Sequence, residues 1–467
     1  MKISGIRITL KYLSPWPLLA MLCAQSISFS PELTYHYESD SEEYSIENIP
    51  IRDYELTILG QYKSNKLNIL ARFGYHLLDG TKIAAFHPIG LSDFTHTQGL
   101  HWVEHPPGIA DDQSNYYIAD MKLTFGDSLS YFYLNKWDKY WGPGVNSLII
   151  STKAPNFFHF GFKWKINKNI HFEYFHGKLM SGITDSNYME LYENRTIDIA
   201  RNLVAHRLEW QPYQGVIISG SELVTYANRL IEMAYLVPFS PFFPIQTYIG
   251  ETDNVIISGD IQFLLNDNFR FYGVLLIDDW SPPSTFQINN NNKFGWQAGI
   301  DWNNIYLKND RLRLEYSWTD HRIFHHKYKV NDYYSFDYPV GFWAGPHAEE
   351  IYMDYSFTLG KNQVQLLFSN AKRGEFTDSI RVYQSGQPSV EIPMYERFSG
   401  KNENKIIIKM YLSRKINERF NFSINYTYVD WKNGNNMFNS RETGELIIEN
   451  STDLIKNSLG FGLQYHY

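Results

Sequence analysis

Apolar and polar residues alternate without a break in the final segment of the chain, Ser458-Leu459-Gly460-Phe461-Gly462-Leu463-Gln464-Tyr465-His466-Tyr467. Every odd-numbered position is large and apolar or aromatic, and every even-numbered position is small or polar. Because side chains of a β-strand point alternately to its two faces, the segment predicts a strand with one apolar and one polar face. Bacterial outer-membrane barrels commonly end in such a strand, whose terminal aromatic residue lies at the membrane interface.

The composition favours the same fold class. Aromatic residues make up 17% of the chain, with 35 Tyr, 31 Phe and 12 Trp, although the mean hydropathy is only −0.37. This combination is typical of a transmembrane β-barrel, in which alternate residues face lipid and water. It disfavours a helical membrane protein, because no apolar run approaches the roughly 18–20 residues that cross a membrane as a helix. Composition alone leaves a soluble β-sandwich or propeller open.

Residues 1–26 have the features of a secretory signal peptide. Three basic residues precede an apolar patch at 18–22, and the small-x-small pattern Ala24-Gln25-Ser26 follows it. Cys23 is the only cysteine, so we expect a mature chain without disulfides. Removal of this segment would make the mature chain more negative than the −8 of the full sequence. That acidity argues against nucleic acid as a partner, which would require a concentrated basic face.

The rest of the chain divides into an acidic leader and one long series of alternating segments. Residues 27–50 are acidic and weakly periodic, and they predict an N-terminal periplasmic segment. Residues 51–467 contain about 16 to 18 alternating segments. We therefore expect an all-β fold, a single large antiparallel transmembrane β-barrel with about 16–18 strands, short periplasmic turns and longer extracellular loops.

The joints between the alternating segments are of two kinds. Short polar joints at 266–268, 360–362 and 417–418 predict tight periplasmic turns. Longer stretches rich in Pro, Gly and Asn predict the extracellular loops, at 78–115, 180–202, 281–292, 321–346, 374–400 and 433–454. The strand count should be even, because both ends of such a barrel lie on the periplasmic side.

Basic residues recur on the polar faces of the predicted strands and would point into the lumen. The members of this set are Arg72, Lys163, Lys165, Arg207, Arg311 and Arg313. Together they would suit an anionic ligand, since guanidinium groups match carboxylates and phosphates. Glu209 and Glu315 fall on the same faces, so pairing with lumenal carboxylates is the alternative at each position.

The sequence lacks the motifs of known catalytic sites. It contains no His-Glu-x-x-His, no Gly-x-Ser-x-Gly and no phosphate-binding Gly-rich loop. The neighbouring carboxylates at 278–279 and at 349–350 would point to opposite faces of a strand. Histidines of the 78–115 stretch lack the regular spacing of metal ligands; they are His87, His96, His101 and His105. We expect no enzymatic activity, no cofactor and no metal site.

The most distinctive stretch is 136–155, which reads KWDKYWGPGVNSLIISTKAP. Its Gly-Pro-Gly predicts a sharp turn between an aromatic-rich strand and a β-branched one. Three aromatic residues precede the turn, namely Trp137, Tyr140 and Trp141. They could stack on sugar rings while their N–H and O–H groups bond hydroxyls. A place in the aromatic girdle at the membrane interface is the alternative.

This stretch resembles the capsule assembly Wzi family of outer-membrane proteins. The resemblance rests on an aromatic pair, Gly-Pro-Gly, a Ser-Leu-Ile-Ile-Ser segment and a following Ala-Pro. The residues that carry it are Tyr140, Trp141, Gly142, Pro143, Gly144, Ser147, Ser151 and Pro155. Stretches at 251–279 and 341–352 look similar to the same family.

The resemblance implies a barrel of roughly 18 strands that binds capsular polysaccharide and helps attach it to the cell surface. The best-known members also carry a small periplasmic helical bundle, for which residues 27–50 are too short here. The expected partners are surface polysaccharide, outer-membrane lipid and, during biogenesis, the barrel-assembly machinery. A general or solute-specific porin is the alternative function, and an outer-membrane hydrolase is the third. An open channel would favour the porin, and a plugged, cationic lumen would favour the polysaccharide binder.

Overall fold

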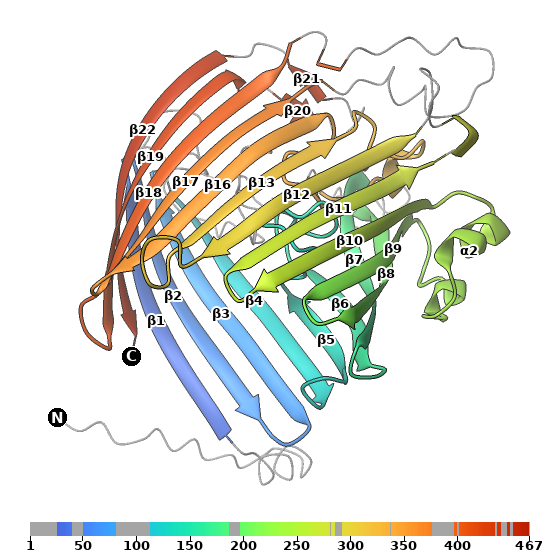
Figure 1. The fold of residues 1–467 in the computed structure, drawn as a ribbon, viewed down its shortest axis with the longest axis horizontal. Coiled ribbons are helices and arrows are strands. Elements are labelled where there is room, and N and C mark those ends of the chain that lie inside the picture. Colours follow the sequence, from blue (N-terminus) through green and yellow to red (C-terminus); the bar gives the residue numbers. More distant parts are fainter. Residues whose placement is uncertain are drawn as a thin grey trace.

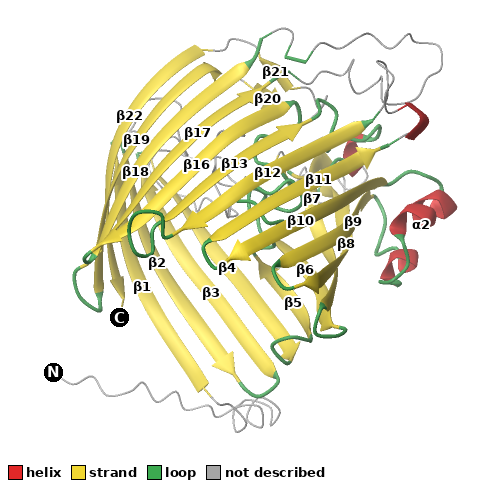
Figure 2. Ribbon diagram, viewed as in Figure 1, coloured by secondary structure: helices red, strands yellow, loops and turns green. Residues whose placement is uncertain are grey.

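The computed structural model describes residues 26–39, 50–80, 113–185, 197–280, 282–284, 292–336, 338–375, 397–398, 401–434, 437–439, 446–448 and 452–466. Within them, eighteen strands form one closed antiparallel sheet, a barrel (Figures 1 and 2). Its strands are Ser26–Glu38 (β1), Ile51–Lys63 (β2), Leu67–Asp79 (β3), Gln113–Gly126 (β4), Tyr131–Trp137 (β5), Phe157–Lys165 (β6), Ile170–Thr184 (β7), Asp198–Tyr213 (β8), Val216–Ala227 (β9), Asn254–Asn266 (β10), Phe269–Asp279 (β11), Lys293–Asn303 (β12), Arg311–Thr319 (β13), Ala348–Leu359 (β16), Asn362–Arg373 (β17), Glu403–Lys415 (β18), Phe420–Gly434 (β19) and Thr452–His466 (β22). This confirms the predicted fold class.

Two short hairpins stand outside the barrel sheet. One is formed by Tyr334–Ser335 (β14) and Tyr338–Pro339 (β15), and the other by Met437–Asn439 (β20) and Leu446–Ile448 (β21). Helical turns lie at Met233–Leu236 (η2), Pro282–Ser284 (η3) and Lys329–Asn331 (η4), and Phe242–Ile249 form an α-helix (α2). No helix in the described ranges is long and apolar enough to cross a membrane.

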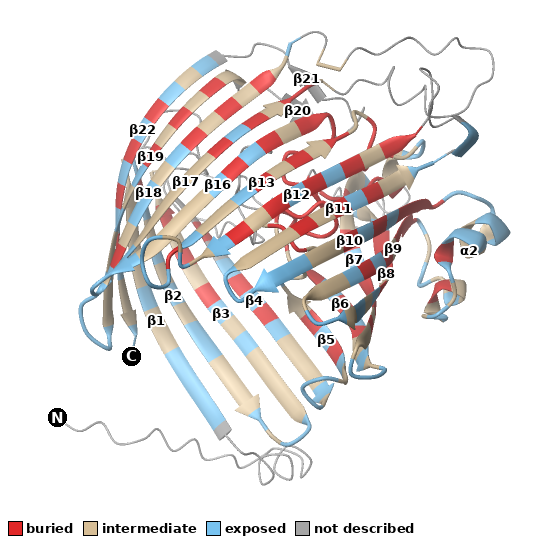
Figure 3. Cartoon of the chain, viewed as in Figure 1, coloured by how far each residue is buried: buried red, intermediate tan, exposed pale blue. Residues whose placement is uncertain are grey.

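The last strand closes the barrel, as its alternation predicts. β22 pairs with β19 on one side and with β1 on the other, in a register that runs from Glu32 opposite His466 to Glu38 opposite Gly460. Its apolar residues, Leu459, Phe461 and Leu463, are exposed on the outer wall, whereas Gly460 and Gly462 are buried on the inner wall. The same alternation of burial runs along the neighbouring strands (Figure 3). Tyr467 lies outside the described residues.

The assignment of residues 27–50 to a periplasmic segment is wrong for its first half. Residues 26–38 form β1, which pairs along its whole length with β2. Its odd-numbered residues face outward, with Ile27, Phe29 and Leu33 exposed on the outer wall, and its acidic residues Glu32 and Glu38 belong to the opposite face. The acidic character hid this period in the sequence, because carboxylates are tolerated on the wet inner face of a barrel. Residues 1–25 lie outside the described residues, so the signal peptide stays a prediction.

Short connections lie at one end of the barrel and long ones at the other. The predicted turns join β10 to β11, β16 to β17 and β18 to β19. These turns, the start of β1 and the end of β22 mark the periplasmic end, and the long connections mark the extracellular end. Two long connections were not predicted as loops, those at 138–156 and 228–253. Both fold back onto the barrel wall, the first inside it and the second outside it.

Residues 228–253, which we call the outer segment, cover the outer faces of β7, β8 and β9. They include η2 and α2, which lies beside the barrel in Figure 1. Tyr235 and Phe242 are fully buried against the wall. Glu222 accepts a hydrogen bond from the backbone N–H of Phe242 at 2.7 Å and pairs with His206 at 3.0 Å. The segment thereby shields polar groups that the wall would otherwise expose to lipid.

Candidate binding site in the barrel lumen

The connection between β5 and β6 folds into the lumen, and we call residues 138–156 the first inward segment. Its tip is held on the opposite wall by Glu315 of β13. The Glu315 carboxylate accepts hydrogen bonds from the backbone N–H groups of Val145 at 2.7 Å and Asn146 at 2.9 Å. The Tyr272 hydroxyl donates to the same carboxylate at 2.5 Å. A buried carboxylate with several donors is a strong anchor, because each of these bonds is charge-assisted.

Two further polar contacts hold Asn146. Its side-chain amide donates to Glu350 at 2.8 Å, and its carbonyl accepts from the Gln297 amide at 2.7 Å. Glu315, Glu350 and Gln297 belong to three different wall strands. The segment is therefore clamped across β12, β13 and β16.

The connection between β13 and β16 also folds inward, and we call residues 320–347 the second inward segment. Its anchor is Arg201 of β8, whose side chain is almost fully buried. The guanidinium donates to the carbonyls of Val330 at 2.7 Å, Tyr334 at 2.7 Å and Lys329 at 3.0 Å. One planar cation thus satisfies three backbone carbonyls of the segment, two in η4 and one in β14.

The two inward segments pack on each other. Ser151 donates its backbone N–H to the Val340 carbonyl at 2.8 Å, and the Tyr333 hydroxyl donates to the Ile149 carbonyl at 2.8 Å. Their fully buried residues form one apolar core inside the barrel, which includes Leu148, Ile149, Ile150, Ile323, Phe324, Tyr333, Val340 and Phe342. The buried chain inside the barrel is visible in Figure 3. The lumen next to β7, β8 and β11–β13 is filled by folded protein.

The Gly-Pro-Gly stretch belongs to the first inward segment and does not link two wall strands. The predicted sharp turn is present, because the backbones of Trp141 and Ile150 pair in antiparallel across it. The stretches that flank it are not wall strands, since β5 ends at Trp137 and β6 begins at Phe157. Gly142 has a φ of +123°, a backbone conformation that is strained for any residue with a side chain. A Cβ atom on Gly144 would collide with the side chains of Gln297 and Glu315. The glycines therefore allow the close approach that Glu315 requires.

The other residues of the resemblance motif also shape this segment. Ser147 donates to the Trp141 carbonyl, and its Oγ accepts the Ile149 backbone N–H at 3.0 Å. Ser151 donates its hydroxyl to the Gly341 carbonyl at 2.5 Å. Pro155 is buried near the end of the segment, and Pro143 accepts a hydrogen bond at its carbonyl from Arg270 at 3.1 Å. Their contacts explain the motif as a fold determinant of the inward segment.

The structure corrects the sugar-stacking role predicted for Trp141. Only 5% of this residue is exposed, and its ring packs edge-on against Phe175 with the centroids 5.2 Å apart. Its indole N–H donates to Glu173 at 3.3 Å, so neither a ring face nor the N–H is open to a ligand. The girdle alternative also fails, because Trp141 lies in the lumen. Tyr140 is partly exposed and donates its hydroxyl to the Gly144 carbonyl, and Trp137 lies 4.8 Å from the Arg72 guanidinium.

The predicted lumenal cations do lie on inner faces, and the four arginines among them pair with carboxylates, Arg72 with Asp120. Arg311 and Arg313 share Asp301, with distances of 3.1 Å and 2.6 Å, and Arg270 also contacts Asp301. Arg207 pairs with Asp260 at 2.7 Å. These contacts support the alternative in which such cations balance lumenal carboxylates. Lys163 and Lys165 flank the outward-facing Trp164 and so belong to the inner face.

A polar cavity lies on the opposite side of the lumen and was not predicted from the sequence. It has a volume of about 560 Å³ and is bounded by β1, β2, β17, β18, β19 and β22. Its lining is rich in amide, hydroxyl and charged side chains; these are Thr34, His36, Glu38, Asp53, Glu55, Gln365, Lys409, Tyr411, Asn421, Ser423, Asn425, Thr427 and Gln464. The polar faces of these strands were visible in the sequence. The cavity was not, because only closure of the barrel brings the first two strands beside the last ones.

The chemistry of the cavity favours hydroxyl groups over anions. Glu38, Asp53 and Glu55 outnumber the basic residues Lys409 and His36 in its lining. Asn425 donates to Glu38 at 3.1 Å, and its amide oxygen is buried against Gly460. Amides and carboxylates offer the mixed donors and acceptors that sugar hydroxyls require. A cavity of this size lies within the usual range for small-ligand sites.

Metal ligation finds no support within the described part of the chain, where no group of three or more His, Cys, Asp or Glu residues is arranged to hold an ion. His87, His96, His101 and His105 lie outside the described residues.

Comparison with known proteins places the fold. No protein-family model and no curated protein matches the chain. Among solved structures it is similar to Wzi of Escherichia coli, described as an outer membrane protein involved in group 1 capsule assembly and a carbohydrate-binding β-barrel. The TM-score is 0.57 and the identity 11%, covering 97% of this chain and 86% of that chain. The chain has the fold of an outer-membrane β-barrel.

Two further solved structures have lower TM-scores. OccAB2 of Acinetobacter baumannii has a TM-score of 0.48 at 10% identity, covering 95% of this chain and 98% of that chain. The outer membrane protein OprD of Pseudomonas aeruginosa has a TM-score of 0.45 at 9% identity, covering 95% and 94%. At such identities the likenesses concern the fold alone.

Acid should loosen the second inward segment. Burial lowers the pKa of His347 from 6.5 to about 3, with Asp320, His321 and Arg397 as its charged or titratable neighbours. Its Nδ1–H donates to the Glu375 carbonyl at 2.9 Å, and its Nε2 accepts the Phe398 backbone N–H at 3.0 Å. The pKa of His347 is lower in the folded protein than in the unfolded chain. Neutral His347 therefore makes its full contribution to the stability of the fold above pH 6.5, and this contribution is lost progressively as the pH falls toward 3.

We therefore expect more frequent channel openings at pH 4 than at pH 7 when the protein is studied in planar bilayers. The His347→Gln variant should show a weaker pH dependence. Equal opening frequencies of the native protein at the two pH values would contradict this role of His347.

Proposed function

We propose that this protein resides in the bacterial outer membrane, binds capsular or other surface polysaccharide, and assists its assembly or attachment at the cell surface. The observation that carries the proposal is the lumen, where two anchored inward segments lie beside a polar cavity. A porin, the alternative, needs a continuous water-filled path, and folded chain across the lumen disfavours it. The proposed function includes no catalytic step.

The fold likeness and the motif support the same proposal. The Wzi structure has a TM-score of 0.57 to this chain, and its description as a carbohydrate-binding β-barrel concerns that protein. The residues by which the sequence resembles that family form the first inward segment and its contacts.

The ligand class proposed from the cavity is a neutral saccharide. This revises the expectation of acidic sugars held by lumenal arginines, because Arg207, Arg311 and Arg313 have carboxylate partners already. The cavity carboxylates also have partners, because Glu38 contacts His36 at 3.3 Å, and Asp53 and Glu55 contact His76 at 3.3 Å and 3.4 Å. The amides and hydroxyls of the lining are therefore the groups proposed to bind sugar hydroxyls. Tyr411 supplies an aromatic surface in the cavity for the apolar face of a sugar ring.

Substitution of Tyr411 tests this site with a matched control. Tyr411 and Tyr426 lie on neighbouring strands with similar exposed fractions, 38% and 40%, but Tyr426 faces outward. We expect Tyr411→Ala to weaken binding of maltoheptaose, a neutral probe, about tenfold, because the ring contact is lost. Tyr426→Ala should leave binding unchanged.

Calorimetric titration of the refolded protein gives the affinity. Equal loss in the two variants would reject the cavity as the site. Large conductance that maltoheptaose does not block would instead favour the porin.

A further inference from the structure

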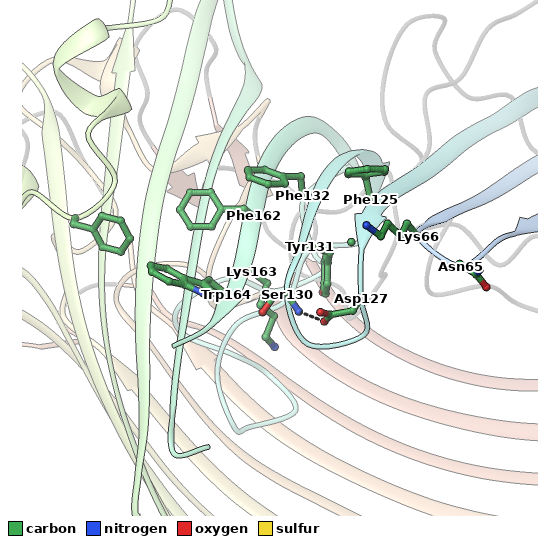
Figure 4. A pocket seen from close by; sticks show the side chains of 12 residues that line it. Asn65, Lys66, Phe125, Asp127, Ser130, Tyr131, Phe132, Phe162, Lys163 and Trp164 are labelled. Carbon is green, nitrogen blue, oxygen red and sulfur yellow. Dashed lines mark hydrogen bonds between the residues drawn. The ribbon is translucent and has the colours of Figure 1, made fainter. Parts of the chain in front are cut away.

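An aromatic groove lies on the outer wall at the periplasmic ends of β4, β5 and β6. Its volume is about 670 Å³, and its lining is mostly apolar. Phe125, Phe132 and Phe162 stand in a row along it, with Trp164 beside them (Figure 4). Phe132 and Trp164 are 66% and 45% exposed, on a wall that faces hydrocarbon.

The outer segment builds the far side of this groove. Phe239 packs against Phe172 with centroids 4.5 Å apart and against Trp164 at 6.0 Å. The position of Phe239 is fixed by its neighbour Pro238, whose carbonyl contacts the His206 ring nitrogen at 2.9 Å. The groove is therefore a recess between a strand wall and a folded segment, unlike the convex wall elsewhere.

The rim of the groove carries one cation at the level of lipid head groups. Lys66 lies in the turn between β2 and β3, and its side chain extends toward Phe125 (Figure 4). Asp127, the acidic residue of the lining, accepts the backbone N–H groups of Leu129 at 2.8 Å and Ser130 at 2.7 Å. Lys163 contributes to the lining but belongs to the inner face. Lys66 is therefore the charge that a head group at this rim would meet.

The geometry points to a binding site for a glycerophospholipid of the periplasmic leaflet. One acyl chain occupies the aromatic groove, and the phosphate contacts the Lys66 ammonium. Aromatic and apolar walls match the chain, and a basic residue beside them matches an anionic head group. This site is independent of the lumenal cavity, so it holds whether the barrel is a polysaccharide binder or a porin.

Native mass spectrometry of the full chain in detergent, with added phosphatidylglycerol or uncharged dioleoylglycerol, tests the site. Lys66→Gln should lower retention of phosphatidylglycerol about fivefold and leave that of dioleoylglycerol unchanged, since one cation near a membrane surface contributes about 1 kcal/mol. Phe132→Ala should lower retention of both lipids. Both substituted residues are exposed, so the barrel should fold normally.

Matched controls are Lys308→Gln, in another periplasmic turn, and Phe73→Ala, on the outer wall away from the groove. Neither should change retention. If Lys66→Gln retains as much phosphatidylglycerol as Lys308→Gln, the head-group contact is wrong. If Phe132→Ala behaves as Phe73→Ala, the groove holds no acyl chain.

Discussion

Replacing Glu315 with alanine is expected to open the barrel to ions. The change removes the acceptor for the backbone N–H groups of Val145 and Asn146 and for the Tyr272 hydroxyl. Hydrogen bonds to a charged partner contribute about 1.5–3 kcal/mol each, and part of this loss is recovered when water reaches the freed groups. A net loss of about 3 kcal/mol would raise the population with a released first inward segment roughly a hundredfold.

Single-channel conductance in planar bilayers measures this effect. The native protein should be mostly closed, and Glu315→Ala should show long open periods. Glu209→Ala is the matched control, because Glu209 also lies on an inner face, near the periplasmic end of β8, and is not part of the Glu315 clamp. Indistinguishable conductance of Glu315→Ala and the native protein would mean that this carboxylate does not hold the segment.

Replacing Arg201 with alanine should release the second inward segment. The carbonyls of Lys329, Val330 and Tyr334 would lose their shared donor in a site where Arg201 is 1% exposed. Buried carbonyls without donors carry a desolvation cost, so we expect a loss of about 3–5 kcal/mol for the segment. Arg201→Lys should be intermediate, because a single ammonium group lacks the planar fork that reaches three carbonyls.

Trypsin cleavage after Arg322, mapped by mass spectrometry, reports on this release. Arg322 is buried in the second inward segment, so the native protein should resist cleavage there. Arg201→Ala should be cut, whereas Arg414→Ala, at the periplasmic end of β18, should resist as the native protein does. Resistance of Arg201→Ala would show that the segment is held by its apolar core alone.

The residues that sequence reasoning placed correctly are those whose role depends on local pattern. Alternation along β22 predicted its two faces, and polar joints predicted the turns after β10, β16 and β18. The same alternation placed Arg207, Arg311 and Arg313 on the inner wall. It failed for β1, where the expectation of a solvated leader outweighed a period carried by residues such as Phe29 and Leu33.

The candidate site was less predictable, because its contacts join residues far apart in the chain. The Gly-Pro-Gly stretch was recognised as distinctive, but a turn between wall strands and a segment folded into the lumen have the same local signal. Only the approach of Gly144 to Glu315 distinguishes them. The polar cavity likewise joins Thr34 and Glu38 of β1 to Asn425 of β19, across the barrel closure.

The sequence by itself determined most of the strands and their two faces, because a period of two in hydrophobicity separates an apolar face from a polar one. The tertiary structure alone decided how the lumen is used. Which cation pairs with which carboxylate follows from strand register, as for the arginines around Asp301. Which loop folds inward depends on single anchors such as Glu315 and Arg201, whose partners are backbone groups that carry no sequence signature.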